Sequence, residues 1–211
     1  MKYIVAQSTP LENSKDNVYE VNDPELVQKY KAAGYQLYKR SYDKIKCHHK
    51  EYTVNCLEFR NDSTGEEPVV IIPDFLSPRR HYPVYVYLYA ILLYCLNLAR
   101  GQRWAAEKTR KYFGLDTFSH TTLGRALKAF VRNITEEEPK PEPEPEPVPA
   151  EDTGAETQKP GVPTAQATAV VRKQVAEFLH SRLGQVEQPE IIGIYCQLAS
   201  EWYKQHQKLL L

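Results

Sequence analysis

The sequence lacks the short motifs that carry catalysis in most soluble enzymes. Its 211 residues contain no H-E-x-x-H zinc motif, no glycine-rich phosphate-binding loop and no Ser, His and Asp context typical of an activated nucleophile. Each of these motifs exists because its chemistry needs particular side chains at a fixed spacing. We therefore expect neither an enzyme nor a protein with a bound cofactor.

Cysteine is scarce and poorly placed for cross-linking. None of the four cysteines forms a C-x-x-C pair, and disulfide frameworks are typical of shorter, cysteine-dense secreted chains. A reducing cytoplasm is therefore the expected location. Cys47 and Cys56, with the adjacent His48 and His49, offer four potential zinc ligands, but their spacing differs from the paired knuckles of zinc ribbons. We expect ordinary thiols and surface histidines there, and no metal.

Long hydrophobic runs are also rare. The N-terminal run Tyr3–Ala6 is too short for a signal peptide. The stretch Tyr82–Ala99 has 18 residues without a formal charge, which is long enough to consider a membrane span. It contains Pro83, Asn97 and five tyrosines spread through its middle, whereas interfacial tyrosines gather at the ends of a span. This composition favours a buried helix, and we expect no membrane association.

The formal net charge of the whole chain is zero, but the charges are distributed unevenly along it. Residues 1–135 hold 20 basic and 14 acidic residues, and residues 136–161 hold 2 basic and 9 acidic ones. The strongest excess lies between Ser77 and Asn133, where ten Lys and Arg residues stand against two acidic residues. Such asymmetry is typical of a basic module that is tethered to an acidic segment.

Apolar periodicity and turn residues divide the chain into five predicted parts, and the expected fold class is mainly α. The alternation of Pro and Glu after residue 136 removes backbone donors and adds repulsion, so that segment cannot form a core. The predicted parts are an N-terminal arm with a short helix at Asp23-Pro24 (1–44), a ribbon-like β-hairpin (45–76), a helix-turn-helix bundle (77–135), a disordered Pro/Glu linker (136–168) and a C-terminal helical hairpin (169–211).

The basic region is predicted to contain three consecutive helices, at about residues 82–100, 103–113 and 119–133. Gly101 and Gly114 end the first two, and Ser119 or Thr117 is positioned to cap the third. A packed helix, a short turn and a second basic helix together favour a helix-turn-helix that binds double-stranded DNA.

Eight side chains are the candidate DNA contacts. The second helix of a helix-turn-helix presents its N-terminal residues to base edges, while cations on both helices reach phosphates. The alternative is a solvated basic face on an ordinary three-helix bundle. The predicted base contacts are Thr121, Thr122 and Arg125, and the predicted phosphate contacts are Lys108, Arg110, Lys111, Lys128 and Arg132.

The segment Ile72-Pro-Asp-Phe-Leu-Ser-Pro-Arg-Arg-His-Tyr82, followed by an apolar helix and the helix-turn-helix pattern, resembles a group of bacterial transposase-like proteins. In that group a zinc ribbon precedes a phrase similar to L-P-x-F-L-x-P-Y-R-x-Y. The resemblance covers roughly residues 45–132 and implies DNA binding. This chain departs from the pattern because it lacks the two C-x-x-C knuckles, carries three extra turn residues (116–118) and has no room for a nuclease domain after Asn133.

Two classes of function therefore stay open. The first is a DNA-binding protein related to transposase DNA-binding regions but without a nuclease, acting as an accessory, regulatory or remnant protein. The second is a non-catalytic interaction or assembly protein that uses the tyrosine-rich helix and the C-terminal helices. In either case the C-terminal helices are expected to self-associate or to bind a protein partner.

Overall fold

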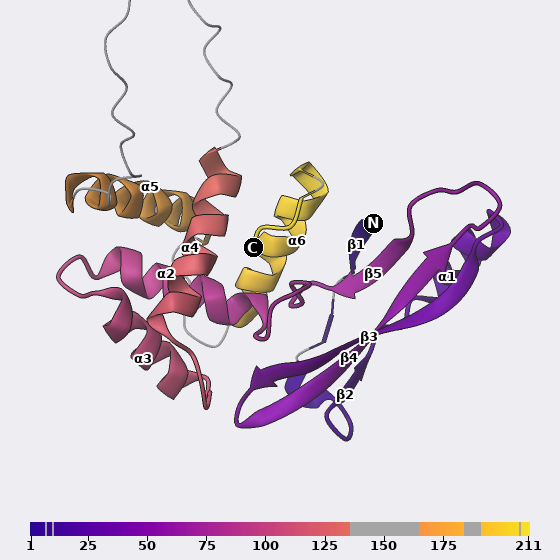
Figure 1. The fold of residues 1–211 in the computed structure, drawn as a ribbon, viewed down its shortest axis with the longest axis horizontal. Helices are drawn as coiled ribbons and strands as arrows, with labels where there is room; N and C mark the ends of the chain where they lie inside the picture. The colour runs from indigo at the N-terminus through magenta and orange to yellow at the C-terminus, as the bar shows by residue number, and fades with distance from the viewer. Residues whose placement is uncertain (7, 10, 136–164, 184–190, 207) are drawn as a thin grey trace, which may run out of the picture.

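The computed structural model describes the chain except residues 7, 10, 136–164, 184–190 and 207. The predicted Pro/Glu linker (136–168) thus falls almost wholly outside the described residues. Figure 1 shows the helices α2 to α6 gathered at one end of the molecule and a curled sheet at the other, with α1 beyond the sheet.

Strand β4 organises a five-stranded mixed sheet. β3 runs antiparallel to β4 along one edge, while β2 and β5 share the other edge, β2 parallel and β5 antiparallel. β1 is added in parallel to β5. The strands are β1 (Lys2–Ala6), β2 (Val18–Glu20), β3 (Gln36–Cys47), β4 (Lys50–Arg60) and β5 (Val69–Pro73).

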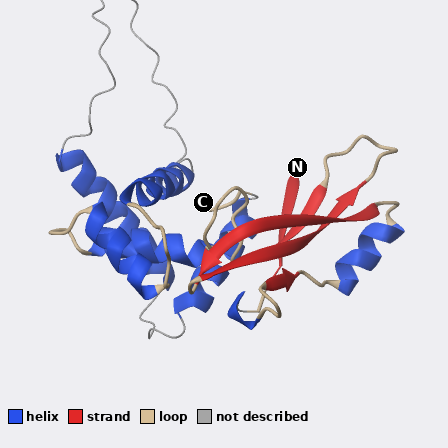
Figure 2. Cartoon of the chain, turned by 60° about the horizontal axis from the view of Figure 1, so that its bottom comes forward, coloured by secondary structure: helices blue, strands red, loops and turns tan. Residues whose placement is uncertain are grey.

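The β3–β4 hairpin is the longest feature of the sheet, and Figure 2 shows it reaching towards the helices. His48 and His49 form its turn with φ values of 50° and 57°, as expected for a two-residue hairpin turn. A register shift between Tyr42 and Ile45 marks a bulge, which bends and twists a strand. The bulge accounts for part of the curl.

Helix α1 confirms the predicted N-terminal helix. Asp23 caps it, because its Oδ1 accepts a hydrogen bond from the Leu26 amide at 3.0 Å, and Pro24 occupies the first turn. Gly34, at φ 84°, lies just beyond its end. The helices are α1 (Pro24–Ala32), α2 (Val84–Leu96), α3 (Gln102–Tyr112), α4 (His120–Thr135), α5 (Ala165–Leu183) and α6 (Ile191–His206), with a short 3₁₀ turn at Leu11–Asn13.

Helix α2 lies at the centre of the main core. It is apolar around most of its circumference, and Tyr85, Tyr87 and Tyr94 are all buried. Within the described residues no helix is long and apolar enough to cross a membrane. The uncharged stretch is thus a buried helix, as predicted, of 13 residues.

The expected mainly α fold is wrong, because a five-stranded sheet makes up much of the N-terminal third. β3 is mostly exposed, so it lacks the apolar alternation that would have revealed it. It is a strand because its backbone pairs with β4 over most of its length. β1 pairs with β5, more than sixty residues away, and no local pattern reports such a contact.

The C-terminal helices share the core of α2. Val175 and Leu179 of α5, and Tyr195 and Trp202 of α6, are buried in the same cluster as α2 and β5. Their apolar faces are therefore used within the chain. Self-association or partner binding through these helices stays a prediction.

Candidate nucleic-acid interface

The N-terminus of α4 is closed by a side-chain cap. The Thr122 amide donates to Ser119 Oγ at 3.1 Å, and the two hydroxyls lie 3.0 Å apart. Ser119 is therefore the cap, and Thr117 instead contacts the Tyr82 hydroxyl at 3.1 Å. Thr122 is half-buried and engaged in the cap, so among the three predicted base contacts only Thr121 and Arg125 are exposed.

One face of α4 carries three exposed cations. Arg125, Lys128 and Arg132 are spaced by three and four residues, which places them on the same side of a helix. The opposite side is buried. In the described part of the chain none of the three cations forms an ion pair with an acidic side chain. The buried residues of α4 are Leu123, Ala126, Leu127 and Phe130.

This basic face forms one wall of a groove of about 720 Å³, and α5 lies on the opposite side. The groove brings together four of the eight predicted DNA contacts: Thr121, Arg125, Lys128 and Arg132. None of the residues that line it is acidic. We call it the α4–α5 groove. It is lined by Tyr94, Gln102, His120, Thr121, Gly124, Arg125, Leu127, Lys128, Val131, Arg132, Val171 and Arg172.

The cations of α3 lie elsewhere. Lys108, Arg110 and Lys111 are exposed, but none of them lines the α4–α5 groove. Lys111 Nζ lies 2.9 Å from Glu107 Oε1, one helical turn away. The same ammonium lowers the pKa of the Glu107 carboxyl. The predicted phosphate contacts are thus split between two surfaces.

Gly124 allows α3 and α4 to approach each other closely. A Cβ atom added there would lie 3.1 Å from Gln102 Oε1, at the start of α3. In the sequence this glycine appears unfavourable, because it costs a helix about 1 kcal/mol relative to alanine. A larger residue there would require the Gln102 side chain to shift slightly.

The tip of the β3–β4 hairpin docks on the turn between α3 and α4. The amide of His48 donates to the Phe113 carbonyl at 2.8 Å, and that of His49 to the Gly114 carbonyl at 2.6 Å. Gly114 has φ 53°, and an added Cβ would lie 2.7 Å from the His49 ring. The hairpin therefore fixes the turn that orients α4.

The three extra turn residues also have a packing role. Phe118 is buried and meets the rings of Tyr82 and Tyr87 at centroid distances of 5.2 and 5.9 Å. Asp116 lies 3.7 Å from His49 Nδ1. The longer turn thus contacts α2 on one side and the hairpin tip on the other.

Arg172 of α5 lines the groove opposite α4 and connects α5 to the end of α2. Its guanidinium donates to the carbonyls of Leu98 at 3.2 Å, Asn97 at 2.7 Å and Arg100 at 3.3 Å, and also to that of Tyr94. These carbonyls lie in the last turn of α2 and just beyond it, where a cation is favourable. Arg172 also lies 4.1 Å from the centroid of the Tyr94 ring.

Cys95 lies in α2 beside this clamp. Burial raises the pKa of its thiol to about 12, although the charge of Arg172 opposes the shift. The thiol is therefore protonated at neutral pH and packs as an apolar group.

Cys47 and Cys56 do not converge. Cys47 pairs across the hairpin with Lys50, whereas Cys56 pairs with Arg40. Cys56 lies six positions after Lys50 along β4, which is roughly 20 Å of strand. Within the described residues, no three His, Cys, Asp or Glu side chains are grouped closely enough to hold a metal ion.

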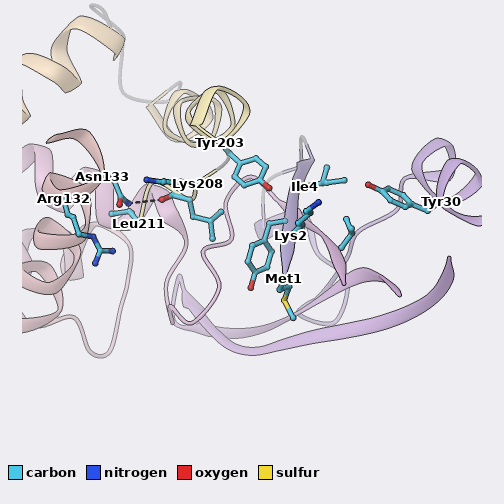
Figure 3. A pocket seen from close by; sticks show the side chains of 12 residues that line it. Met1, Lys2, Ile4, Tyr30, Arg132, Asn133, Tyr203, Lys208 and Leu211 are labelled. Carbon is cyan, nitrogen blue, oxygen red and sulfur yellow. Dashed lines mark hydrogen bonds between the residues drawn. The ribbon is translucent and has the colours of Figure 1, made fainter. Parts of the chain in front are cut away.

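A second groove, of about 960 Å³, lies between β1, α6 and the C-terminal residues (Figure 3). Lys2, Lys208 and Arg132 line it, so Arg132 belongs to both grooves. Asn133 Nδ2 donates to the carbonyls of Leu209 at 3.0 Å and Leu210 at 3.1 Å, which holds the C-terminal residues beside α4. Positive charge therefore continues from α4 towards β1.

Lys2, Lys208 and Arg172 were missed by sequence reasoning. Lys2 and Lys208 stand near opposite ends of the chain, and only the fold places them along the same groove as Arg132. Arg172 lies on a helix whose periodicity predicts burial of its neighbours Val171 and Val175. No signal in a single sequence distinguishes a clamping arginine from a solvated one.

The segment Ile72–Tyr82, which carries the transposase-like resemblance, has a structural role here. The Asp74 amide donates to Ala6 at 3.0 Å, and the Lys46 amide donates to the His81 carbonyl at 2.7 Å. Burial raises the pKa of the Asp74 carboxyl, which accepts a hydrogen bond from Ser8. The segment joins the sheet to α2.

Neither family models, nor curated proteins, nor solved structures show a match to this chain.

Proposed function

We propose that this protein binds double-stranded DNA without catalysing a reaction, and that the exposed basic face of α4 is the principal contact. The observation that carries the proposal is the convergence of Arg125, Lys128 and Arg132 on one face, in a groove without an acidic residue. Uncompensated cations in a line are the electrostatic pattern that a phosphate backbone requires.

The spacing of these cations suits a phosphate backbone. Three and four residues of helix correspond to rises of about 4.5 and 6 Å. Lys208 and Lys2 extend the positive charge beyond the end of α4. Thr121 and Arg125, in the first turns of α4, are the proposed base contacts, because Arg pairs with guanine edges and Thr contacts the thymine methyl group. Lys108, Arg110 and Lys111 are proposed as peripheral phosphate contacts.

The placement of α5 shapes how DNA would approach. Phe178 of α5 meets Phe130 of α4 at a centroid distance of 5.7 Å, so α4 is flanked on that side. Docking along the exposed rim of α4 needs no movement of α5. Deep insertion of α4 into a major groove would require α5 to move away.

The alternative function, an interaction protein, has less support. Its proposed surfaces were the tyrosines of α2 and the apolar faces of the C-terminal helices. Tyr85, Tyr87 and Tyr94 are buried, and α5 and α6 pack on α2. We extend the DNA-binding proposal to a cytoplasmic location, which fits the four free cysteines. Kinship with transposase DNA-binding regions stays a prediction.

The test is fluorescence anisotropy of the full chain with a labelled random duplex between about 50 and 200 mM salt. The triple variant Arg125→Ala/Lys128→Ala/Arg132→Ala should weaken binding about 100-fold at low salt and flatten the log–log salt slope by about 2.7, which is three phosphate contacts. The matched control Lys15→Ala/Lys29→Ala/Lys31→Ala removes the same charge from exposed positions near the sheet. Equal losses in both variants, or no binding at low salt, would refute the proposal.

A further inference from the structure

The α4–α5 groove combines an apolar floor with a cationic rim. Leu127, Val131 and Val171 supply aliphatic surface, and Tyr94 adds an aromatic ring. Arg125, Lys128 and Arg132 stand on one side of this surface. A phosphate backbone is polar throughout, so it uses the rim but leaves the floor without a contact.

The size of the groove points to a smaller ligand. Sites for small molecules usually enclose about 300–1,000 Å³ and are mostly apolar with a few convergent polar groups. The α4–α5 groove, at about 720 Å³, lies within this range. A duplex is too wide to enter it, whereas a ring system or a short acyl chain fits.

Arg172 adds a buried positive charge to the α5 wall of the groove. This residue lines the groove and is only 8 % exposed. Its terminal nitrogens are engaged with the carbonyls near the end of α2, but its Nε–H has no hydrogen-bond acceptor among the described residues. The hydrogen bonds of its terminal nitrogens hold this guanidinium in place, so its positive charge is fixed in the α5 wall of the groove.

We infer that the α4–α5 groove binds a small organic anion, with an aromatic or aliphatic body on the apolar floor and a carboxylate, sulfonate or phosphate group on the cations of α4. The site itself is independent of DNA binding. Its regulatory consequence rests on the proposed function: because Arg125 and Lys128 serve both ligands, the anion and the duplex compete.

The first experiment uses anilinonaphthalene sulfonate as the probe and measures its fluorescence on the full chain. The neutral N-phenylnaphthylamine has the same rings without the sulfonate, so it isolates the contribution of the charge. Arg125→Gln/Lys128→Gln should weaken the sulfonate about tenfold or more, which is roughly 1.4 kcal/mol, and leave the neutral probe within about twofold. Lys15→Gln/Lys29→Gln is the matched control and should change neither probe.

A second experiment measures which anions displace the bound anilinonaphthalene sulfonate. Dodecanoate and naphthyl phosphate should each displace the sulfonate, and their relative strength tells a carboxylate site from a phosphate site. Amide chemical-shift changes should map to α4 and the start of α5. Equal affinity for the charged and neutral probes, insensitivity to the double variant, or shifts that map elsewhere would overturn the inference.

The two proposals fail separately. If the sulfonate binds as expected but no duplex does, the anion site stands and DNA binding is refuted. If the duplex binds through α4 but the sulfonate ignores the double variant, the anion site is refuted and DNA binding stands. Where both bind, the duplex should displace the sulfonate; simultaneous binding would overturn the inferred competition.

Discussion

The two sides of the α4–α5 groove use arginine in opposite ways. Arg172 on α5 is buried, and its guanidinium is hydrogen bonded to four backbone carbonyls that follow or end α2. Arg125 and Arg132 on α4 are exposed and have no acidic partner in the described chain. The contrast teaches that a cation near a groove holds the fold when backbone acceptors surround it, and is available to a ligand when they do not.

The largest expected effect is a loss of stability when the buried Arg172 is replaced. Arg172→Ala should lower the free energy of unfolding by about 3 kcal/mol, because the carbonyls at the end of α2 lose a charged donor from a buried side chain. Urea unfolding followed by circular dichroism measures this loss. The neighbouring Lys173→Ala, at an exposed position, should change it by less than about 0.5 kcal/mol. Similar values for both variants would remove the distinction between the two arginine roles.

Gly114→Ala tests whether the contact between the β3–β4 hairpin tip and the α3–α4 turn fixes the orientation of α4. Its φ of 53° is unfavourable for a residue with a Cβ, and the His49 ring would have to move away. We expect a loss of about 1–2 kcal/mol in the free energy of unfolding. Gly193→Ala, in an exposed part of α6 where an added Cβ meets nothing, is the control and should be neutral or stabilising. A neutral Gly114→Ala would mean that the hairpin tip does not orient α4.

The pH dependence of stability probes the surroundings of Arg172. Burial raises the pKa of Cys95 from 9.0 to about 12, so above pH 9 the unfolded chain loses a proton that the folded chain retains. Stability is therefore present below pH 9 and falls as pH rises towards 12. Between pH 8 and 10 this thiol should account for about 1 kcal/mol. Urea unfolding at both values, compared with Cys95→Ala, should show a shallower pH dependence in the variant; an unchanged dependence would contradict the assignment.

The smallest effect should come from α3. Lys108→Ala/Arg110→Ala/Lys111→Ala should weaken duplex binding only about threefold, which is near 0.7 kcal/mol, because these cations lie outside the groove and one already pairs with Glu107. Anisotropy at low salt measures it beside the α4 triple variant. A loss as large as that of the α4 variant would show that total charge, and not the placement of α4, governs binding.

Local patterns predicted the elements whose causes are local. Asp23-Pro24 marks the start of α1, Gly114 follows α3, and Ser119 caps α4. The same kind of reasoning predicted a hairpin from β4 and β5, which do pair, but it missed β3, which forms the longer hairpin with β4. A strand whose side chains are mostly exposed carries little apolar signal, so the sheet was underestimated and the fold class was wrong.

The candidate site also has features that the sequence predicts and features that depend on the tertiary structure. Arg125, Lys128 and Arg132 share a face because helical spacing requires it, and this follows from the sequence alone. Their arrangement opposite α5, the clamp of Arg172 on α2 and the approach of Lys2 and Lys208 to Arg132 depend on contacts between segments far apart in the chain. Helix periodicity is a property of consecutive residues. A groove is a property of which surfaces pack together, and only the tertiary structure decided that.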